Sequence, residues 1–406
     1  MGLHKGSEAV IVEAIRTPVG KYGGILKDVR PDDLSAYVLK KLVEKTGLDP
    51  NLIEDVLWGC ANQAGEDNRN VGRMAVLLAG FPHSIPAATI NRLCGSSLDA
   101  INQAARAIWS GDYETAIAGG VESMTRAPYV ISKNVSGRAL YGNLPAYDTA
   151  LGWRFPNPEM ERMFPLESMG ETAENIAEKW KIPRKAQDAF ALQSHRRAVD
   201  ATRQGKFREE IVPIHVPGPK GQSIAVEEDE GPRPDTSPEK LAQLKPVFRK
   251  GGSVTAGNSS SLNDGAAALL IMSKQKAKET GLQPIVEIVS TGVAGVDPRY
   301  MGTGPIPATH IALKKAGLTL KDIGLIELNE AFAVQSLAVL DELGASQEIV
   351  NVNGGAIALG HPLGCTGARL MTTLIHEMRR RQTRYGLATM CIGVGQGIST
   401  IVELSS

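Results

Sequence analysis

Three short segments of the sequence place a thiol or an imidazole beside glycine. Cys94 lies in NRLCGSS, His361 in ALGHPLG and Cys391 in CIGVGQG. Because glycine leaves backbone N–H groups accessible, an acyl thioester can approach each of these side chains closely. A thiol that carries an acyl group, a base that activates it and a second thiol that moves a proton together suit carbon–carbon bond chemistry on thioesters. The sequence therefore predicts an enzyme.

The position of each side chain suggests a role. Cys94 is predicted to lie between a strand and the helix that follows it, where the positive end of the helix dipole favours the thiolate. His361, with an ordinary pKa of about 6.5, would deprotonate this thiol. Cys391 precedes glycines at alternate positions, which would leave one face of a strand bare for another group. The simpler alternatives are buried, inert cysteines and a turn histidine that bonds a carbonyl.

Two further segments are candidates for holding substrate atoms. Asn329 ends an apolar strand, where its amide would hold a water or an oxyanion, and residues 253–268 form a small-residue stretch whose backbone a narrow ligand would follow. Ordinary turns explain both segments equally well. Cys60 and Cys365 are predicted to be structural, because no base or open backbone stands beside them. The sequence contains no metal-ligand cluster, dinucleotide fingerprint or P-loop, so no metal site is predicted.

The composition is that of an ordinary globular protein and argues against a nucleic-acid-binding, a membrane-spanning or a secreted protein. Hydrophobic residues make up 42% and charged residues 22%, and 44 basic residues balance 44 acidic ones. Charge therefore does not favour a nucleic-acid partner. No apolar run reaches the length of about 18 residues that a membrane span needs. The four cysteines have no disulfide-like spacing and the first residues have no secretory signal, which together predict the cytoplasm.

Alternating β-branched runs and amphipathic stretches predict an α/β fold, and an internal duplication supports it. Residues 39–59 and 313–330 share a Leu-Lys-Lys helix end, a Gly-Leu turn and an apolar strand. About 35 residues later each copy reaches a cysteine at a glycine-rich turn, Cys94 in one and Cys365 in the other. Two such halves would pack face to face and bring their equivalent turns together.

The regular periodicity of the sequence is lost between these halves. From residue 125 to residue 250 proline, glycine and asparagine interrupt any regular period, apart from one pair of helical stretches near 169–207. We expect one half to comprise residues 1–124 and 251–280 and the other to comprise residues 281–406. Residues 125–250 would form an inserted loop domain that covers a binding site.

Four of these segments together resemble the signature segments of the thiolase family: Cys94, Asn-Glu-Ala-Phe at 329–332, Gly-His-Pro at 360–362 and Cys-Ile-Gly at 391–393. The resemblance extends from EAIRTPVGKYGG near the start to GQGIST near the end. It implies two βαβαβαββ halves, each a mixed five-stranded sheet with helices in layers, and a loop domain inserted in the first half. It also implies an acetyl-CoA C-acyltransferase that cleaves 3-oxoacyl-CoA to acetyl-CoA and a shortened acyl-CoA, reversibly, through an acyl-cysteine.

The family mechanism assigns roles to five positions of this chain. By resemblance, His361 takes the proton of Cys94, whose thiolate attacks the 3-oxo carbon, and Cys391 protonates the departing acetyl-CoA enolate. Coenzyme A then takes the acyl group from Cys94. The enolate oxygen would be held by His361 and by a water on Asn329. The other oxyanion would meet the backbone N–H groups of Cys94 and Gly393.

The resemblance also implies how substrate and partners bind. Coenzyme A and acetyl-CoA are substrates, and no cofactor is bound permanently. Arg233 would reach the nucleotide end of coenzyme A, because a guanidinium suits phosphate and stacks on adenine. The positions that would line the pantetheine and acyl channel are Met169, Ala256, Ser260, Ala331 and Phe332. Thiolases are generally homodimers or homotetramers, so further copies of the chain are expected partners.

Departures from the family pattern leave the acyl chain open. Ser168 stands where short-chain acetoacetyl-CoA thiolases usually carry histidine, and KPVFRKGGSVTAGN resembles degradative enzymes, particularly those that cleave 3-oxoadipyl-CoA. Cys365 and Thr366 instead resemble thiolases of fatty-acid β-oxidation. The rival classes are a non-catalytic acyl-CoA or lipid carrier, a decarboxylating ketoacyl synthase and a cysteine hydrolase. The first would have lost a reactive side chain, the second would lack Cys391, and the third would not need free coenzyme A.

Overall fold

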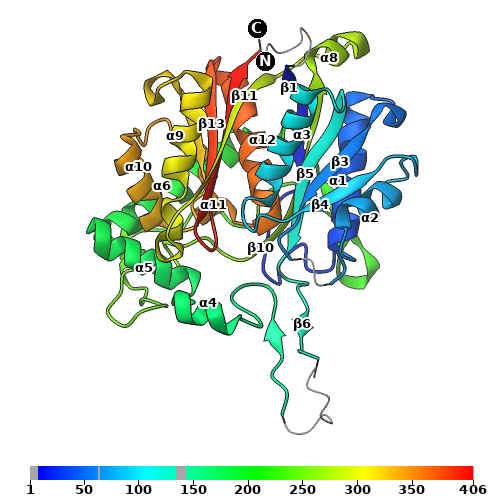
Figure 1. Ribbon diagram of the computed structural model, residues 1–406. Helices are drawn as coiled ribbons and strands as arrows, with labels where there is room; N and C mark the ends of the chain where they lie inside the picture. Colours follow the sequence, from blue (N-terminus) through cyan, green and yellow to red (C-terminus); the bar gives the residue numbers. More distant parts are fainter. Residues whose placement is uncertain (1–7, 63–64, 134–142, 406) are drawn as a thin grey trace.

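A mixed sheet of ten strands forms the centre of the computed structural model, which describes residues 8–62, 65–133 and 143–405 (Figure 1). The strands of this sheet are β1 (Ala9–Arg16), β2 (Gly20–Lys21), β3 (Asp55–Gly59), β4 (Ala87–Ile90), β5 (Thr115–Ser123), β10 (Asn263–Ser273), β11 (Val286–Gly295), β12 (Leu325–Leu328), β13 (Tyr385–Ile392) and β14 (Gln396–Leu404). Two small pairs lie outside it, β6 (Tyr129–Val130) with β7 (Tyr147–Asp148) and β8 (Ile214–Pro217) with β9 (Ser223–Val226).

Helices connect these strands and cover the sheet. The α-helices of the described chain are α1 (Pro31–Thr46), α2 (Val71–Leu78), α3 (Ser96–Ser110), α4 (Pro158–Met163), α5 (Met169–Trp180), α6 (Arg184–Arg203), α7 (Pro238–Ala242), α8 (Lys274–Thr280), α9 (Pro305–Ala316), α10 (Ala333–Leu343), α11 (Ala356–Leu359) and α12 (Leu363–Arg381). Short 3-10 turns are η1 (Pro50–Leu52), η2 (Pro219–Gly221), η3 (Pro298–Thr303) and η4 (Leu320–Asp322).

The sheet repeats one pairing pattern from its two ends, in the order β12-β13-β14-β11-β1-β10-β5-β3-β4. In the first half β4, β3 and β5 are parallel, and β10 and β1 continue antiparallel. In the second half β12 and β13 are parallel and β14 and β11 continue antiparallel, while a single bridge from Ile326 to Val350 takes the place of β4. The predicted duplicated α/β fold is confirmed.

One detail of the sheets was not expected from the sequence. The edge strands β1 and β11 pair antiparallel through Val10 with Glu287 and Ile11 with Val286. The two predicted sheets are therefore continuous at one edge. Only two residues of each strand take part in this pairing. The pairing therefore connects the halves over a short part of each strand.

The helices form three layers around this folded sheet (Figure 1). The middle layer is α3 with α12, whose apolar side chains such as Leu98 and Leu374 pack together between the two halves. On the outer faces, α1 and α2 cover the first half, and α9 and α10 cover the second. Helix α12 is buried from Gly364 to Met378, and the polar side chains on this stretch, such as Arg369, are buried with it.

Local signals explain where the first helix begins and ends. The sequence indicated Asp33 as its capping residue, but α1 begins earlier, with Pro31 in its first turn. Proline suits the first helical position because its fixed φ is helical and its missing N–H has no partner there in any helix. Gly47 ends the helix as predicted, with φ 66°, a left-handed conformation that other residues seldom adopt.

The segment from 125 to 250 contains the predicted helical pair, α5 and α6, together with α4, α7 and the two small strand pairs. The β6–β7 pair projects away from the body of the molecule, and α4 and α5 lie beside its base (Figure 1). Helix α5 packs on α10, and α6 packs on α10 and α11. The domain boundaries at 124, 250 and 280 stay a prediction.

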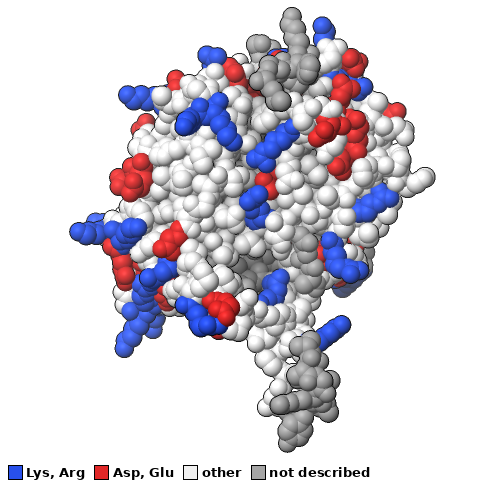
Figure 2. Space-filling model, viewed as in Figure 1, with Lys and Arg blue, Asp and Glu red and all other residues white. Residues whose placement is uncertain are grey.

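The surface view shows Lys and Arg interspersed with Asp and Glu, without a field of one sign (Figure 2). This distribution agrees with the equal numbers of acidic and basic residues in the sequence. Among the described helices, none is both long and apolar enough to cross a membrane.

Candidate active site

The N-terminal ends of the two central helices meet, which brings the turns before them together. The backbone N–H of Ala368 in α12 donates to Ser97 Oγ in α3 at 2.9 Å. Gly367 allows this approach, because a Cβ atom at that position would lie 2.4 Å from the backbone nitrogen of Leu98. The turns that carry Cys94 and His361 therefore reach the same region, as the duplication predicted.

Cys94 lies in a tight turn between β4 and α3 and is partly exposed. Leu93 adopts φ 47°, a left-handed conformation, and Gly95 precedes the first helical residue. Burial raises the pKa of the Cys94 thiol to about 11, although N–H groups of Gly393 and of Cys94 itself oppose this effect. The backbone N–H groups favour the thiolate, as expected at a helix end, but burial outweighs them, so Cys94 needs a base.

Two of the glycines after Cys391, Gly393 and Gly395, lie in a turn, and only Gly397 lies in a strand, where the backbone of Gly304 packs against it. Strand β13 ends at Ile392, and β14 starts at Gln396. Val394 and Gly395 both have positive φ, 63° and 81°, which closes the hairpin. This turn directs the backbone N–H of Gly393 toward the sulfur of Cys94.

Cys391 itself is 2% exposed and faces the same region as Cys94. Its pKa is raised, first by burial and then by the charge that Cys94 would carry. The two sulfurs are thus close enough for the charge of one to affect the proton of the other. At neutral pH the resting site holds both as thiols.

His361 is buried and its backbone is fixed by a neighbouring strand. Its N–H donates to Asn263 Oδ1 at 2.9 Å, and Asn263 Nδ2 donates to the carbonyl oxygen of Gly20 at 2.9 Å. Gly360 precedes it with φ 103°, and a Cβ atom there would lie 2.5 Å from the side chain of Asn263. This position requires glycine for both conformation and space.

Contacts on both ring nitrogens define which one carries the proton. Nδ1 of His361 lies 2.7 Å from Thr366 Oγ1, and that hydroxyl donates to the carbonyl oxygen of Pro362 at 2.9 Å. Nε2 lies 3.3 Å from Nδ2 of Asn329, which is a donor. A hydroxyl has one hydrogen and an amide nitrogen accepts none, so Nδ1 donates to Thr366 and the unprotonated Nε2 accepts from Asn329.

The pKa of His361 is lower than the ordinary value that the sequence led us to expect. Burial, and then the positive charge of Arg369, lower its pKa to about 3, well below the ordinary value of about 6.5. The ring is therefore neutral at pH 7, with Nε2 as acceptor. The ring becomes positive only when a negative group forms beside it at the same time. A thiolate is such a group, and it forms when His361 takes the proton of a thiol.

Asn329 connects the histidine turn to the strand of Cys391. It follows β12, and its backbone N–H donates to the carbonyl oxygen of Thr389, two residues before Cys391, at 3.0 Å. Its side chain is fully buried, and its Oδ1 has no hydrogen-bond partner among the described residues. Buried polar atoms without a partner are rare in proteins and are often functional.

Four of the predicted ligand-binding residues lie in or against the buried cluster that contains Cys391. Ser260 donates from its backbone N–H and its Oγ to the carbonyl oxygen of Ala331, at 3.0 and 3.1 Å. Ala331, Phe332 and Cys391 belong to one buried cluster, against which Met169 packs. The sulfur of Met169 also lies 3.6 Å from the place of a Cβ atom on Gly393.

The other two predicted residues, Arg233 and Ala256, line a separate cavity of about 400 Å³. Three cationic side chains face it, against a single carboxylate; these residues are Lys21, Arg233, Lys240 and Asp235. Ser259, Ser261 and Ile357 also line it. Ser260, which contacts Ala331, lies between Ser259 and Ser261 in the sequence, so one wall of the cavity continues to the cluster that contains Cys391.

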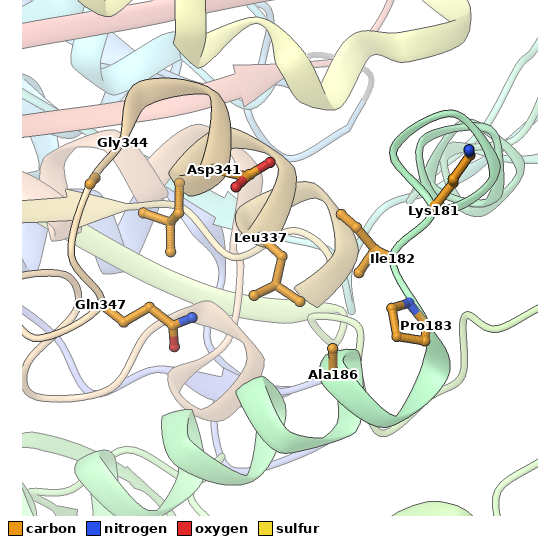
Figure 3. Close-up of a pocket in the computed structure, with 10 residues that line it drawn as sticks. Lys181, Ile182, Pro183, Ala186, Leu337, Asp341, Gly344 and Gln347 are labelled. Atoms are coloured by element: carbon orange, nitrogen blue, oxygen red, sulfur yellow. The ribbon is translucent and has the colours of Figure 1, made fainter.

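Another cavity, of about 430 Å³, contains none of the predicted residues. It lies between the connection of α5 to α6 and the end of α10, with Ile182 and Leu337 on its walls and Lys181 and Asp341 at its margin (Figure 3). No reactive thiol or imidazole lines it.

Comparison with known proteins identifies the family. The model of the thiolase N-terminal domain matches residues 9–275, and that of the thiolase C-terminal domain matches residues 282–404. The chain belongs to the thiolase family. It is therefore an acyltransferase, and the predicted enzyme class is confirmed.

Individual relatives match this thiolase over nearly the whole chain. It is 55% identical to a 3-oxoadipyl-CoA/3-oxo-5,6-dehydrosuberyl-CoA thiolase from Escherichia coli strain K12, covering 98% of this chain and 99% of the relative. It is 52% identical to a beta-ketoadipyl-CoA thiolase from Pseudomonas putida, with the same coverage. The crystal structure of the Bacillus anthracis acetyl-CoA acetyltransferase is similar with a TM-score of 0.92 and 44% identity, covering 98% and 99%. CoA-dependent cleavage of 3-oxoacyl-CoA, predicted from the motifs, is confirmed.

Sequence reasoning missed the residues that hold this thiolase's site together. Glu122, buried at the end of β5, accepts backbone N–H groups of Ala61, Asn62 and Gly364 at 2.9, 3.1 and 2.8 Å. Burial raises its pKa to about 7. A carboxylate that ends an apolar strand was a visible signal, but its partners lie more than 50 residues away in sequence on both sides.

Substitution of Thr366 tests the assigned tautomer. Thr366→Val keeps the shape but removes the acceptor for Nδ1–H of His361, so the proton no longer has a preferred nitrogen. We expect kcat to fall about tenfold, equivalent to about 1.4 kcal/mol, with KM changed less. Thr366→Ser should restore most of the rate, because it keeps the hydroxyl. Equal rates for the valine and serine variants, measured by steady-state thiolysis, would contradict the assignment.

Proposed function

We propose that Cys94 is the nucleophile, His361 its base and Cys391 the acid that protonates carbon. The observations that support this proposal are a neutral imidazole whose Nε2 is unprotonated and two thiols that influence each other's protonation. Nε2 of His361 takes the proton from Cys94, and the sulfur attacks the 3-oxo carbon of the substrate. The bond between C2 and C3 breaks, and its electron pair forms the enolate of acetyl-CoA. Cys391 donates its proton to this enolate carbon.

Coenzyme A completes the cycle in the proposed scheme. Its thiol loses a proton to the Cys391 thiolate, and its sulfur attacks the carbonyl carbon of the acyl-Cys94 thioester. The bond between this carbon and the Cys94 sulfur breaks, and Cys94 regains a proton from His361. Each side chain thereby returns to its starting state, and the steps in reverse form a carbon–carbon bond.

Two groups of donors would stabilise negative oxygen in these steps. The backbone N–H groups of Cys94 and Gly393 already face the Cys94 sulfur, so a tetrahedral oxyanion formed there would lie beside them. On the other side, Asn329 and His361 would hold the enolate oxygen, directly or through a water. Donors preset in this way commonly lower a barrier so much that removing one costs about 10²–10³ in rate.

The proposed path of coenzyme A follows the two adjoining spaces. Met169, Ser260, Ala331 and Phe332 would contact the acyl group and pantetheine arm, next to the sulfurs. Ala256 and Arg233 would contact the outer part, where the cavity carries an excess of positive side chains. A polyanionic nucleotide matches that charge. This assignment orders the residues from the reacting carbon outward.

The substrate that we propose is 3-oxoadipyl-CoA. The relatives from E. coli and Pseudomonas putida carry this acyl group in their names, at 55% and 52% identity. Ser168, which caps α5 by accepting the N–H of Glu171, is smaller than the histidine of short-chain thiolases and leaves more space beside Met169. Acetoacetyl-CoA and fatty 3-oxoacyl-CoA of β-oxidation are the alternatives.

A matched pair of substrates tests this choice. Both 3-oxoadipyl-CoA and 3-oxohexanoyl-CoA have six acyl carbons, and only the first ends in a carboxylate. We expect kcat/KM for thiolysis to be higher for 3-oxoadipyl-CoA by about tenfold or more, because a site that pairs a charged group rejects an analogue lacking it. Acetoacetyl-CoA should be slower than both. A faster reaction of 3-oxohexanoyl-CoA would favour a fatty acyl substrate instead.

We further propose a cytoplasmic homodimer or homotetramer. The reactive thiols Cys94 and Cys391 form no disulfide, as the chemistry requires and as a reducing compartment maintains. Large apolar side chains remain exposed around the projecting pair, with Tyr129 at 72%, Ile131 at 54% and Met163 at 67%. Another copy of the chain is the partner we propose for them. Light scattering of the purified protein would reveal a monomer if this is wrong.

A further inference from the structure

A buried group of charges lies at the end of β1, apart from the reactive thiols. Arg16 is 1% exposed; its Nε donates to Glu210 Oε1 at 2.7 Å, and its Nη1 and Nη2 donate to the two carboxylate oxygens of Asp229 at 2.7 and 2.9 Å. The backbones also pair, because Arg16 N–H donates to the Glu210 carbonyl at 2.8 Å. A residue near the chain start is thus joined to two points of the inserted segment.

The same contacts extend to the residues that follow Arg16. Asp229 Oδ1 also accepts the N–H of Val19 at 2.8 Å. Its neighbour Glu230 donates its N–H to the Val19 carbonyl at 3.0 Å, and accepts the N–H groups of Lys21 and Ile25 at 2.8 and 3.1 Å. Asp229 and Glu230 together therefore hold the 19–25 loop in one place.

The residues held in this way form two walls of the outer cavity. Lys21 lines it from the 19–25 loop, while Gly231 and Arg233 line it from the segment just after Glu230. Gly231 lies so close to α11 that a Cβ atom on it would approach the Ala358 carbonyl oxygen to 2.2 Å. Arg233 N–H lies 3.3 Å from Nδ1 of the buried His195 and points toward it. Lys21 belongs to β2, which also pairs with β10, and the contacts at Asp229 and Glu230 join this strand and the loop after it to the segment that carries Arg233.

Stability alone is a weak explanation for this arrangement. Buried ion pairs contribute little net stability, because removing the charges from water costs about as much as their attraction returns. What they supply is one fixed geometry, since each oxygen of Asp229 has a specific donor. A binding wall that is already in place avoids the entropic cost of ordering when a ligand arrives.

We infer that Arg16 and Asp229 are positioning residues for the phosphate-bearing end of the substrate. They hold Lys21 and Arg233 at the spacing that a polyanionic nucleotide needs, without touching it. This inference rests on the proposed function, in which Arg233 contacts the nucleotide of coenzyme A. It predicts an effect that depends on the nucleotide and not on the thioester chemistry.

Asp229→Asn tests the inference, because it keeps the shape and the acceptor for Val19 but places an amide against the Arg16 guanidinium. The probes are the best 3-oxoacyl-CoA of the substrate series and the same acyl group on pantetheine, each with its matching thiol as acceptor. With the coenzyme A pair we expect kcat/KM to fall about tenfold, mostly through KM. The ratio of coenzyme A to pantetheine kcat/KM should fall at least about fivefold. Equal losses with both probes would overturn the inference.

Three further variants separate the possible outcomes. Glu230→Gln, which disturbs only the contacts to the 19–25 loop, should shift the same ratio in the same direction if Asp229→Asn folds poorly. Leu39→Ala, buried in α1 on the outer face, lowers stability without reaching the cavity and should leave the ratio unchanged. Arg233→Ala tests the proposed function itself. If Arg233→Ala changes the ratio but neither Asp229→Asn nor Glu230→Gln does, the inference is refuted and the proposed function is not. If Arg233→Ala leaves the ratio unchanged, the proposed nucleotide site is refuted.

Discussion

Replacement of Cys94 by alanine is expected to abolish acyl transfer and to prevent any acyl-enzyme from forming. No other described thiol combines partial exposure with a backbone donor already on its sulfur. Removing a nucleophile commonly costs about 10⁵-fold or more in turnover. Intact-protein mass spectrometry after incubation with acetyl-CoA should show one added acetyl group on the native protein and none on Cys94→Ala.

Cys365→Ala provides the matched control for loss of a thiol. Cys365 is 1% exposed, and burial raises its pKa to about 12, so it is inert at neutral pH. This variant should acquire the acetyl group and retain turnover within about twofold, since its side chain only fills space. If Cys94→Ala still becomes acetylated and Cys365→Ala does not, the nucleophile has been assigned to the wrong half of the duplication.

The pKa of Cys94 also predicts how the thiol reacts with small electrophiles. Because burial raises this pKa to about 11, little free thiolate exists at pH 7 and alkylation depends on transfer of the proton to His361. His361→Ala should therefore slow alkylation of Cys94 by iodoacetamide at pH 7 about tenfold or more. As pH rises toward 11 the difference should shrink, because hydroxide then ionises the thiol directly. Equal alkylation rates at pH 7 would remove the base role of His361.

Most of the fold was visible in the sequence, because its signals are local. Strands such as AATI and the Gly47 helix end follow from residue type and spacing alone. The duplication then predicted that the turns before α3 and α12 would meet. The pairing of β1 with β11 was not predictable, because it joins the backbones of residues about 276 positions apart, and none of the four residues is of a type that marks such a pairing. Gly393 and Gly395 misled for a related reason, since a period of two fits a strand and a hairpin turn equally well.

The reactive side chains were also visible, but their protonation was not. Residue type marks Cys94 and His361 as a thiol and a base wherever they lie. The pKa values of both depend on burial, and that of His361 depends also on Arg369, and only the tertiary structure supplies these surroundings. Thr366 appeared in the sequence merely as a hint about acyl-chain preference, yet its hydroxyl fixes the tautomer of His361. A hydrogen bond between two side chains produces no repeating pattern of residue types, so a single sequence does not predict it.

Replacement of Cys391 by alanine should separate the two halves of the reaction. Cys94 and His361 remain, so the variant is expected to accept an acyl group from acyl-CoA at close to the native rate. Proton transfer at carbon loses its acid and base, which should slow overall thiolysis about 10³-fold. The decisive measurement is exchange of the acetyl-CoA methyl protons with deuterium oxide, followed by NMR. Exchange at the native rate in Cys391→Ala, in a sample whose acylation is intact, would show that another group moves this proton.

The coupling between the sulfurs explains why a second thiol suits this task. A negative charge on Cys94 raises the pKa of Cys391, so Cys391 keeps its proton while Cys94 is the attacking thiolate. Once Cys94 carries the acyl group it is neutral, and this obstacle to ionising Cys391 disappears. Cys391 can then give its proton to the enolate and hold the charge until coenzyme A arrives. The site thus holds one negative sulfur at a time. Cys391→Ala removes the thiolate that carries the charge between protonation of the enolate and deprotonation of coenzyme A.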